Sequence, residues 1–299
     1  LRMTFRFNDS PFAGREGKYV TGRQIRERLD KELQSNVALR VEDNGDAFVV
    51  WGRGLLHLGI LLENMRREGY ELSVGKPEVV FHTDDKGKRL EPIEHLVVDV
   101  PTDVVGPVMQ LVGDRRAEMT HMETLGERTQ MEFTIPARGL IGLRSRVLTA
   151  TAGEVIMHHR FASYGPYRGD IAGRQNGVLI ATEPGMVTAY AAEQLADRGI
   201  LFVDPGDEIY AGQIVGENCK DKDLGVNVVR RKNLTNVRSA NKDTTVTLKA
   251  IRKITLEGSL EYIESDEYVE VTPNSIRIRK AHLKESDRKR AGRAAVGSV

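Results

Sequence analysis

Hydrophobic and polar residues follow the same succession of patterns twice along the first 165 residues. In each copy, short alternating or β-branched runs, typical of strands, surround two stretches with apolar residues three and four positions apart, typical of helices. Residues 1–75 and residues 76–165 both give the order βαββαβ. That order predicts an α+β protein with two tandem ferredoxin-like modules, each a split βαβ unit with helices on one face of its sheet.

Turn and capping residues help to place the expected elements. Thr21 is a candidate N-cap, and Asn44-Gly45 is a hairpin signal. The first module is expected to hold strands at 3–8, 37–42, 47–51 and 72–74, with helices after Thr21 and Gly54. The second is expected to hold strands at 79–81, 93–100, 118–125, 130–135 and 155–161, with helices after Asp103 and Gly139.

One short motif occurs in both modules, at the junction of a strand and a helix. Residues 52–58 read GRGLLHL, and residues 137–143, 85 positions later, read ARGLIGL. Arg53 and Arg138 therefore stand where each strand leads into a helix. Each arginine could bind a backbone phosphate or pair with a surface carboxylate, and chemistry alone favours the structural role.

The pattern changes after residue 165, where glycine and turn residues become frequent and the apolar runs become short. We expect residues 166–299 to form a mostly β domain, for which a barrel is one arrangement. Short helices are expected at 189–198 and 256–264, and strands at 246–251, 268–271 and 276–278, the last of them followed by an uneven basic tail.

Charge is distributed unevenly, although the whole chain carries a net charge of only +1. Residues 220–242 hold seven Lys or Arg and two Asp, a net charge of +5, and residues 277–293 hold eight and two acids, a net charge of +6. Such a concentration in the last third points to a polyanion such as nucleic acid. The alternative is a solvated loop and a disordered basic tail.

The basic loop at 220–242 is the strongest candidate for RNA contact. A loop of that length with little apolar pattern is uncommon inside a compact domain and is usually functional or disordered. It has no aromatic residue, which argues against base stacking and for recognition of backbone or shape. Its candidate contacts are the cations and amides Lys220, Lys222, Arg230, Arg231, Lys232, Asn233, Asn236, Arg238 and Lys242.

Catalytic signatures are weak. The chain has no P-loop run, and Gly52-Arg53-Gly54 lacks the third glycine of a dinucleotide fingerprint. His158 and His159 are adjacent, so on a strand they would point to opposite faces and could not easily share a metal. The single cysteine, Cys219, forms no internal disulfide and fits a reducing cytoplasm, and no apolar run approaches the roughly 20 residues that a membrane span needs.

Several of these stretches resemble a known family. The motifs SPFAG at 10–14, VVWGRGLLHL at 49–58, LLENMRREG at 61–69, VGKP at 74–77 and PARGLIGL at 136–143 resemble domains III and V of translational GTPases such as elongation factor G. The segment KNLTNVRS at 232–239 does not resemble elongation factor G. It is similar to the C-terminal domain of the BipA/TypA family of ribosome-associated GTPases.

The resemblance implies a C-terminal fragment of such a protein, with modules at 1–75 and 76–165 and a family-specific domain at 166–299. GTP and Mg would bind in the absent N-terminal GTPase domain, so this fragment would need no cofactor and would not hydrolyse GTP. The full protein would act in the cytoplasm at the A-site region of the bacterial ribosome, in ribosome assembly and in adaptation to cold and stress.

The resemblance also assigns partners and residue roles. The basic loop would reach the acceptor end of A-site tRNA near the peptidyl-transferase centre. Arg138 would face ribosomal RNA, and Arg53 and His57 would relay between the GTPase domain and the ribosome. Two other readings stay open: a protein-protein interaction module whose basic segments only confer solubility, and an unrecognised enzyme using His158, His159 or Cys219.

Overall fold

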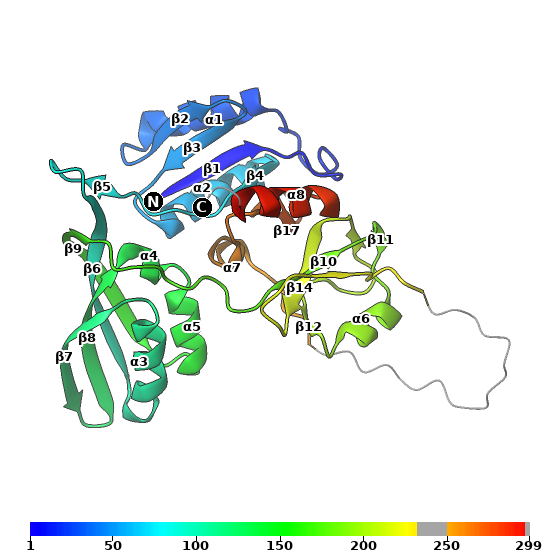
Figure 1. The fold of residues 1–299 in the computed structure, drawn as a ribbon. Coiled ribbons are helices and arrows are strands. Elements are labelled where there is room, and N and C mark those ends of the chain that lie inside the picture. Colours follow the sequence, from blue (N-terminus) through cyan, green and yellow to red (C-terminus); the bar gives the residue numbers. More distant parts are fainter. Residues whose placement is uncertain (232–249, 297–299) are drawn as a thin grey trace, which may run out of the picture. The chain divides into compact units, whose positions relative to one another are not determined.

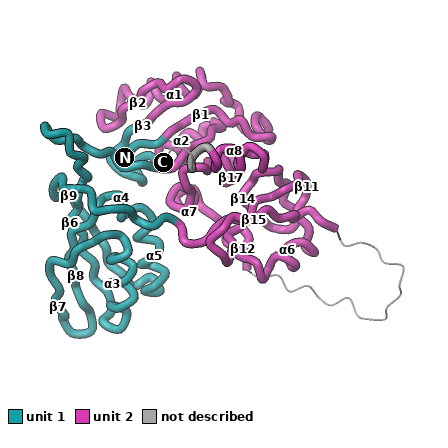
Figure 2. The backbone as a smooth tube through the Cα atoms, in the orientation of Figure 1, with its two compact units in different colours: residues 1–3, 50–58, 77–173 teal, residues 4–49, 59–76, 174–299 magenta. Residues whose placement is uncertain are grey.

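The computed structural model describes residues 1–231 and 250–296, with side chains up to residue 293 in the C-terminal helix (Figure 1). These residues form a mixed α+β structure with several sheets, and no sheet in the described ranges is closed into a barrel. The chain folds into two compact units (Figure 2). Unit 1 comprises residues 1–3, 50–58 and 77–173, and unit 2 comprises residues 4–49, 59–76 and 174–299.

The first 75 residues contain the expected order of elements. Their strands lie in the sheet order β4-β1-β3-β2. The first helix starts where the sequence predicts, because Thr21 and Gln24 form a reciprocal capping box that satisfies otherwise unpaired backbone N–H groups. The elements are β1 (Arg2–Phe7), α1 (Gly22–Ser35), β2 (Arg40–Asn44), β3 (Ala47–Trp51), α2 (Leu55–Glu68) and β4 (Leu72–Val74).

The sheet of this first module continues into strands from the end of the chain. Strand β4 pairs antiparallel with β16, with Val74 opposite Val269 and Leu72 opposite Val271. The result is a ten-stranded sheet in the order β15-β10-β14-β17-β16-β4-β1-β3-β2, with β12 paired to β14. The added strands are β10 (Val178–Ala181), β12 (Gly199–Leu201), β14 (Gln213–Asn218), β15 (Leu224–Val226), β16 (Glu267–Val271) and β17 (Ile276–Lys280).

Short elements complete the C-terminal region. Helix α6 packs an apolar face into a small core that includes Leu179, Val215 and Val226. The remaining elements are β11 (Gly185–Met186), β13 (Glu208–Ile209), α6 (Ala189–Leu195), α7 (Leu256–Tyr262) and α8 (Glu285–Val296).

Unit 1 holds the second module, whose sheet order is β9-β6-β8-β7, with β5 also paired to β6. Leu96, Val98 and Val100 of β6 face a core that the helices of this module complete. The elements are β5 (His82–Thr83), β6 (Arg89–Pro101), a 3-10 turn (Thr102–Val104), α3 (Val105–Gly113), β7 (Glu118–Leu125), β8 (Arg128–Pro136), α4 (Ala137–Leu140), α5 (Leu143–Ala150) and β9 (Ile156–Pro166).

Three expected elements differ from the structure. The strand expected at 79–81 is wrong, since pairing with β6 begins only at His82, opposite Leu90. The single helix expected after Gly139 is broken in two, because Gly142 takes a left-handed φ of 71° between α4 and α5. The uneven basic tail is instead helix α8. Its first turn holds acidic residues, which interact favourably with the positive end of the helix dipole. The strand expected at 246–251 lies mostly outside the described residues.

Buried charges hold the shared sheet of unit 2 together. Glu267 is fully buried and accepts two hydrogen bonds from the guanidinium of Arg174, at 2.9 and 3.0 Å. It also accepts from Nζ of Lys280 at 2.9 Å and from the backbone N–H of Glu264 at 2.9 Å. A buried carboxylate is tolerated when it is paired and hydrogen-bonded in this way.

A second buried carboxylate connects the first module to the C-terminal strands. Glu270 on β16 accepts hydrogen bonds from Nδ2 of Asn8 and Oγ of Ser10, both at 3.0 Å. Its other oxygen accepts from the hydroxyl of Tyr210 at 2.7 Å, while Arg277 donates to the first oxygen at 3.1 Å. The SPFAG motif at 10–14 therefore begins in a polar junction between two parts of the sequence.

This network predicts that unit 2 loses stability in acid. Burial by itself raises the pKa of each carboxyl, but hydrogen bonds and positive charges outweigh it and leave the pKa below its ordinary value. The affected groups and main partners are Glu267 with Arg174, Asp223 with Lys280, and Glu16 with Thr272 and Arg277. A carboxyl group whose pKa is lowered by folding stabilises the folded state at any pH above its unfolded-state pKa. This stabilisation is lost as the pH falls through its folded-state pKa.

We therefore expect the free energy of unfolding to fall as the pH drops below the ordinary values of 4.5 for Glu and 3.8 for Asp. Urea unfolding followed by circular dichroism between pH 7 and pH 3 measures it. Glu16→Gln should make the decline shallower. A free energy that stays constant down to pH 3 would refute the expectation.

Candidate nucleic-acid interface

The first half of the predicted basic loop is held by a ladder of backbone hydrogen bonds. The backbone N–H of Gly177 donates to the carbonyl of Lys220 at 2.7 Å, and the side chain of Asn218 donates to the carbonyl of Lys222 at 2.6 Å. Leu224 to Val226 then form β15, parallel to β10. This stretch is thus part of the sheet, although its sequence pattern predicts a loop.

The next residues are tied to the start of helix α6. The hydroxyl of Thr188 caps that helix by accepting from the N–H of Ala191 at 3.1 Å, and it donates to the carbonyl of Arg230 at 2.6 Å. The N–H of Thr188 donates to the carbonyl of Val228 at 3.0 Å. One threonine therefore fixes both the helix end and the backbone that carries Arg230.

The described cations of the loop extend from this fixed backbone into solvent. Lys220, Lys222, Arg230 and Arg231 are all exposed. Accessible cations on a held backbone can bind phosphates with little ordering cost. The other predicted contacts, Lys232, Asn233, Asn236, Arg238 and Lys242, lie outside the described residues.

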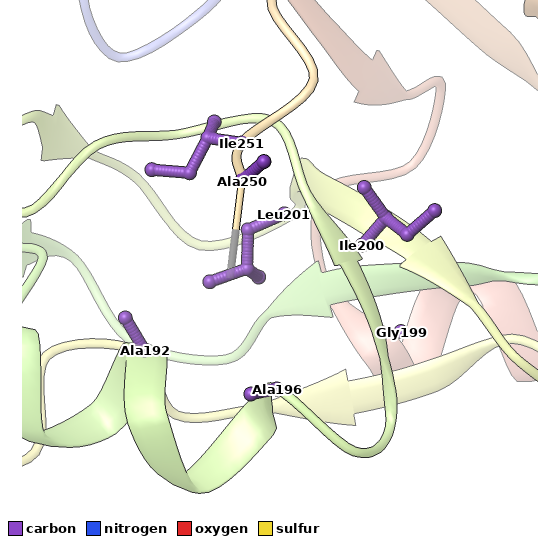
Figure 3. Close-up of a pocket in the computed structure, with 7 residues that line it drawn as sticks. All are labelled: Ala192, Ala196, Gly199, Ile200, Leu201, Ala250 and Ile251. Carbon is purple, nitrogen blue, oxygen red and sulfur yellow. The ribbon is translucent and has the colours of Figure 1, made fainter. Parts of the chain in front are cut away.

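The chain returns to the same core at residues 250–252. The N–H of Arg252 donates to the carbonyl of Leu201 at 3.0 Å. An apolar hollow of about 40 Å³ lies beside this return, between Ala192 and Ala196 of the α6 region, Leu201 of β12, and Ile251 (Figure 3). Drug-sized ligands need clefts of roughly 300 Å³ or more, so the hollow does not hold a nucleotide.

Arg138, predicted to contact RNA, has partners within unit 1. Its Nε lies 2.6 Å from Oε2 of Glu91, whose side chain is buried. It also donates to the carbonyl of Gly169, and its guanidinium lies 4.5 Å from the ring centroid of Tyr167. Because Glu91 would otherwise be an unpaired buried charge, this arginine has a structural task, and its contact with RNA stays a prediction.

The predicted relay residues Arg53 and His57 lie together at the start of α2. The N–H of Arg53, two residues before the helix, donates to Nδ1 of His57 at 3.2 Å, so a side chain of the first turn holds the backbone that leads into α2. The Arg53 side chain is exposed. This geometry positions both residues, while their relay role stays a prediction.

The residues considered for catalysis do not form a described site. His158 and His159 are neighbours on β9, and His159 Nδ1 lies 2.6 Å from Oε2 of Glu94. Cys219 is exposed in unit 2. Within residues 1–231 and 250–296, no cluster of His, Cys, Asp or Glu has a geometry that could hold a metal ion.

A set of exposed aromatic side chains in unit 1 was not predicted from the sequence. Phe161 and Tyr164 on β9 are 53% and 51% exposed, and Tyr167 is 40% exposed. The signal was available as HHRFASYGPYR at 158–168, where aromatic and basic residues are interspersed. This stretch lies outside the basic loop at 220–242 and was therefore not among the predicted contacts.

Comparison with known families covers most of the chain. Residues 88–175 match the model of the elongation factor G C-terminus, and residues 176–285 match the TypA/BipA C-terminal domain. A Bacillus subtilis (strain 168) protein called "Large ribosomal subunit assembly factor BipA" is 52% identical over 297 residues, or 98% of this chain and 48% of that protein. The chain belongs to the TypA/BipA family.

Other relatives carry the same name. The protein of Synechocystis sp. PCC 6803 is 52% identical over 95% of this chain and 48% of its own length, and that of Escherichia coli K12 is 49% identical over 98% and 49%. A solved structure from Thermus thermophilus aligns at a TM-score of only 0.35 with 14% identity, over 55% of this chain and 40% of that one, and carries no argument. The chain thus spans about half the length of its BipA relatives and corresponds to their C-terminal part.

The matched models describe C-terminal domains alone, which agrees with the lack of a P-loop run in the sequence. In the part of the chain that the structure describes, no helix is long and apolar enough to cross a membrane.

Proposed function

We propose that this chain is the ribosome-binding C-terminal part of a BipA-type translational GTPase that acts in assembly of the large ribosomal subunit. The observation that carries the proposal is the match over nearly the whole chain to proteins named large ribosomal subunit assembly factors. The GTPase activity, with GTP and Mg, belongs to the N-terminal half of such proteins. Action in the cytoplasm at the A-site region, and in adaptation to cold and stress, forms part of the same proposal.

The RNA contacts are proposed for the basic segment 220–242. Four of its cations are solvent-accessible on a backbone that hydrogen bonds hold to β10 and to the start of α6. Their partners would be ribosomal RNA and the acceptor end of A-site tRNA. Arg138, whose side chain is 16% exposed, would add a contact from the second module.

We further propose that residues 1–75 and 76–165 are ferredoxin-like modules. The strand orders β4-β1-β3-β2 and β9-β6-β8-β7 support it, since both follow one chain order of βαββαβ. Residues 166–299 would form the family-specific domain, which shares its sheet with the first module.

Co-sedimentation with bacterial large ribosomal subunits across a salt series tests the function. We expect the affinity of the chain to fall steeply with salt, because cations that neutralise phosphates release counterions on binding. Changing Arg230, Arg231 and Lys232 together to Ala should weaken binding and lower the slope of log affinity against log salt by about 3.

Glu193→Ala, an exposed change on the solvent side of α6, serves as the control and should bind as the parent does. Binding that is indifferent to salt would refute RNA recognition. Equal binding by the triple variant and the parent would favour the alternative, a protein interaction module in which the basic segment only confers solubility.

A further inference from the structure

Unit 1 presents aromatic rings to solvent at the end of β9 and on β5, two strands that flank β6 from opposite sides. The rings of Phe161 and Tyr164 lie 5.3 Å apart and that of His82 lies 5.4 Å from Tyr164. Phe161 and Tyr164 are each about half exposed, at 53% and 51%. We call His82, Phe161 and Tyr164 the ring cluster.

A second pair of rings beside this cluster carries arginines on its faces. The rings of Phe81 and Tyr167 lie 6.0 Å apart. The guanidinium of Arg89 lies 3.6 Å from the centroid of Phe81 and 5.6 Å from that of Tyr167, and Arg138 covers Tyr167 at 4.5 Å. Both sets combine a residue at β5 with residues at the end of β9. Strand β6 holds these two segments together, because its Leu90 pairs with His82 on one side and with Pro166 on the other.

The acids of this region are mostly engaged within the protein. Glu91 is buried against Arg138, and Glu94 pairs with His159. Asp84 accepts from two backbone N–H groups of its own turn, and Asp170 accepts from the hydroxyl of Tyr167.

The lysines of the same turn, by contrast, are directed to solvent. Lys86 and Lys88 are exposed in the hairpin that joins β5 to β6, and neither has an ion pair within the described ranges. The turn therefore offers two exposed lysines beside the rings, together with the exposed carboxylate of Asp85.

Exposed rings beside unpaired cations match the chemistry of single-stranded nucleic acid. Bases stack on aromatic side chains whatever their sequence, and the cations neutralise the accompanying phosphates. Bases in a duplex are already stacked on one another and cannot reach the rings. We propose that the ring cluster binds unpaired nucleotides by stacking, with Lys86 and Lys88 on the phosphates. This inference rests on the proposed function, because that function makes RNA the partner of this chain.

Fluorescence anisotropy with a labelled 12-nucleotide oligouridylate tests the inference without ribosomes. Changing Phe161 and Tyr164 together to Ala should weaken binding by at least about 20-fold, from roughly fivefold or more for each ring. Phe161→Tyr with Tyr164→Phe keeps both rings and should bind as the parent does. Leu125→Ala, which shortens a 64% exposed side chain elsewhere in unit 1, is the matched control and should also bind unchanged.

Two further measurements separate stacking from charge. An RNA duplex of the same length should bind the parent more weakly than the single strand does. The duplex should bind the ring variant with the same affinity as it binds the parent. Changing Lys86 and Lys88 to Ala should lower the salt slope by about 1.4 while the preference for single strands remains.

Equal oligouridylate binding by the ring variant and the parent would overturn the inference, as would equal affinity for duplex and single strand. The Arg230, Arg231 and Lys232 variant should still bind the oligonucleotide. If that variant and the parent both fail on ribosomes while ring-dependent binding persists, the proposed function falls and the stacking surface stands.

Discussion

Replacing Glu267 by Gln is expected to lower the free energy of unfolding by about 3–5 kcal/mol. The carboxylate is completely buried, and the substitution leaves the guanidinium of Arg174 and the ammonium of Lys280 without their shared counter-charge. Both cations are nearly buried, with side chains 10% and 3% exposed, so water replaces little of the lost interaction. Chemical unfolding followed by circular dichroism measures the difference.

The matched control for this change is Glu285→Gln. Glu285 also pairs with a lysine, Lys289 at 2.7 Å, but both side chains are largely exposed. Exposed pairs contribute little to stability, so the control should unfold as the parent does. A loss below about 1 kcal/mol for Glu267→Gln would show that Asp223 and Asp266, which also contact Lys280, suffice to compensate the cations.

Gly177→Ala is expected to reduce both stability and ribosome binding. A Cβ atom at this position would overlap the carbonyl group of Lys222 and would lie 2.6 Å from the backbone nitrogen of Asp223. Backbone must move to admit it, and such overpacking typically costs about 1–3 kcal/mol. The segment that moves carries Lys220 and Lys222, so binding to the large subunit should weaken as well.

Gly59→Ala is the control for Gly177→Ala, because its added Cβ meets nothing within 4 Å. Gly59 lies inside α2, where alanine is the better helix former, and the change should stabilise the protein by up to about 1 kcal/mol. Thermal unfolding and co-sedimentation are measured on the same samples. If the Gly177→Ala variant is destabilised but binds the ribosome normally, the backbone position of this segment does not matter for RNA contact.

Local patterns in the sequence predicted the elements of the first two modules well. Thr21 marked the start of α1, and the alternation in 130–135 marked β8, because capping and face periodicity act over a few residues. The broken helix at Gly142 was missed, since one left-handed residue leaves the apolar spacing almost unchanged. Helix α8 was missed because its first half, ESDRKR, is entirely polar and the non-polar residues that follow are mostly small, so no stripe of large apolar residues marks it.

Long-range pairing was beyond such patterns. Nothing local in Leu72–Val74 shows that β4 lies beside β16, yet this pairing joins the first module to the C-terminal strands. The same limit applies to the interface. The basic composition of 220–242 was visible, but the anchoring of Arg230 by Thr188 depends on residues that are about 40 positions apart. The ring cluster likewise brings His82 next to Tyr164 only through the sheet.

The pairing of β4 with β16 also has a consequence for synthesis of the protein. About 190 residues separate the two strands, and chains grow at roughly 5–20 residues per second, so β4 waits on the order of 10–40 s for its neighbour. During that time its edge offers free N–H and C=O groups to any other strand. Folding on the ribosome therefore cannot proceed strictly from the N-terminus, and the nascent chain has reason to need protection until its last strands emerge.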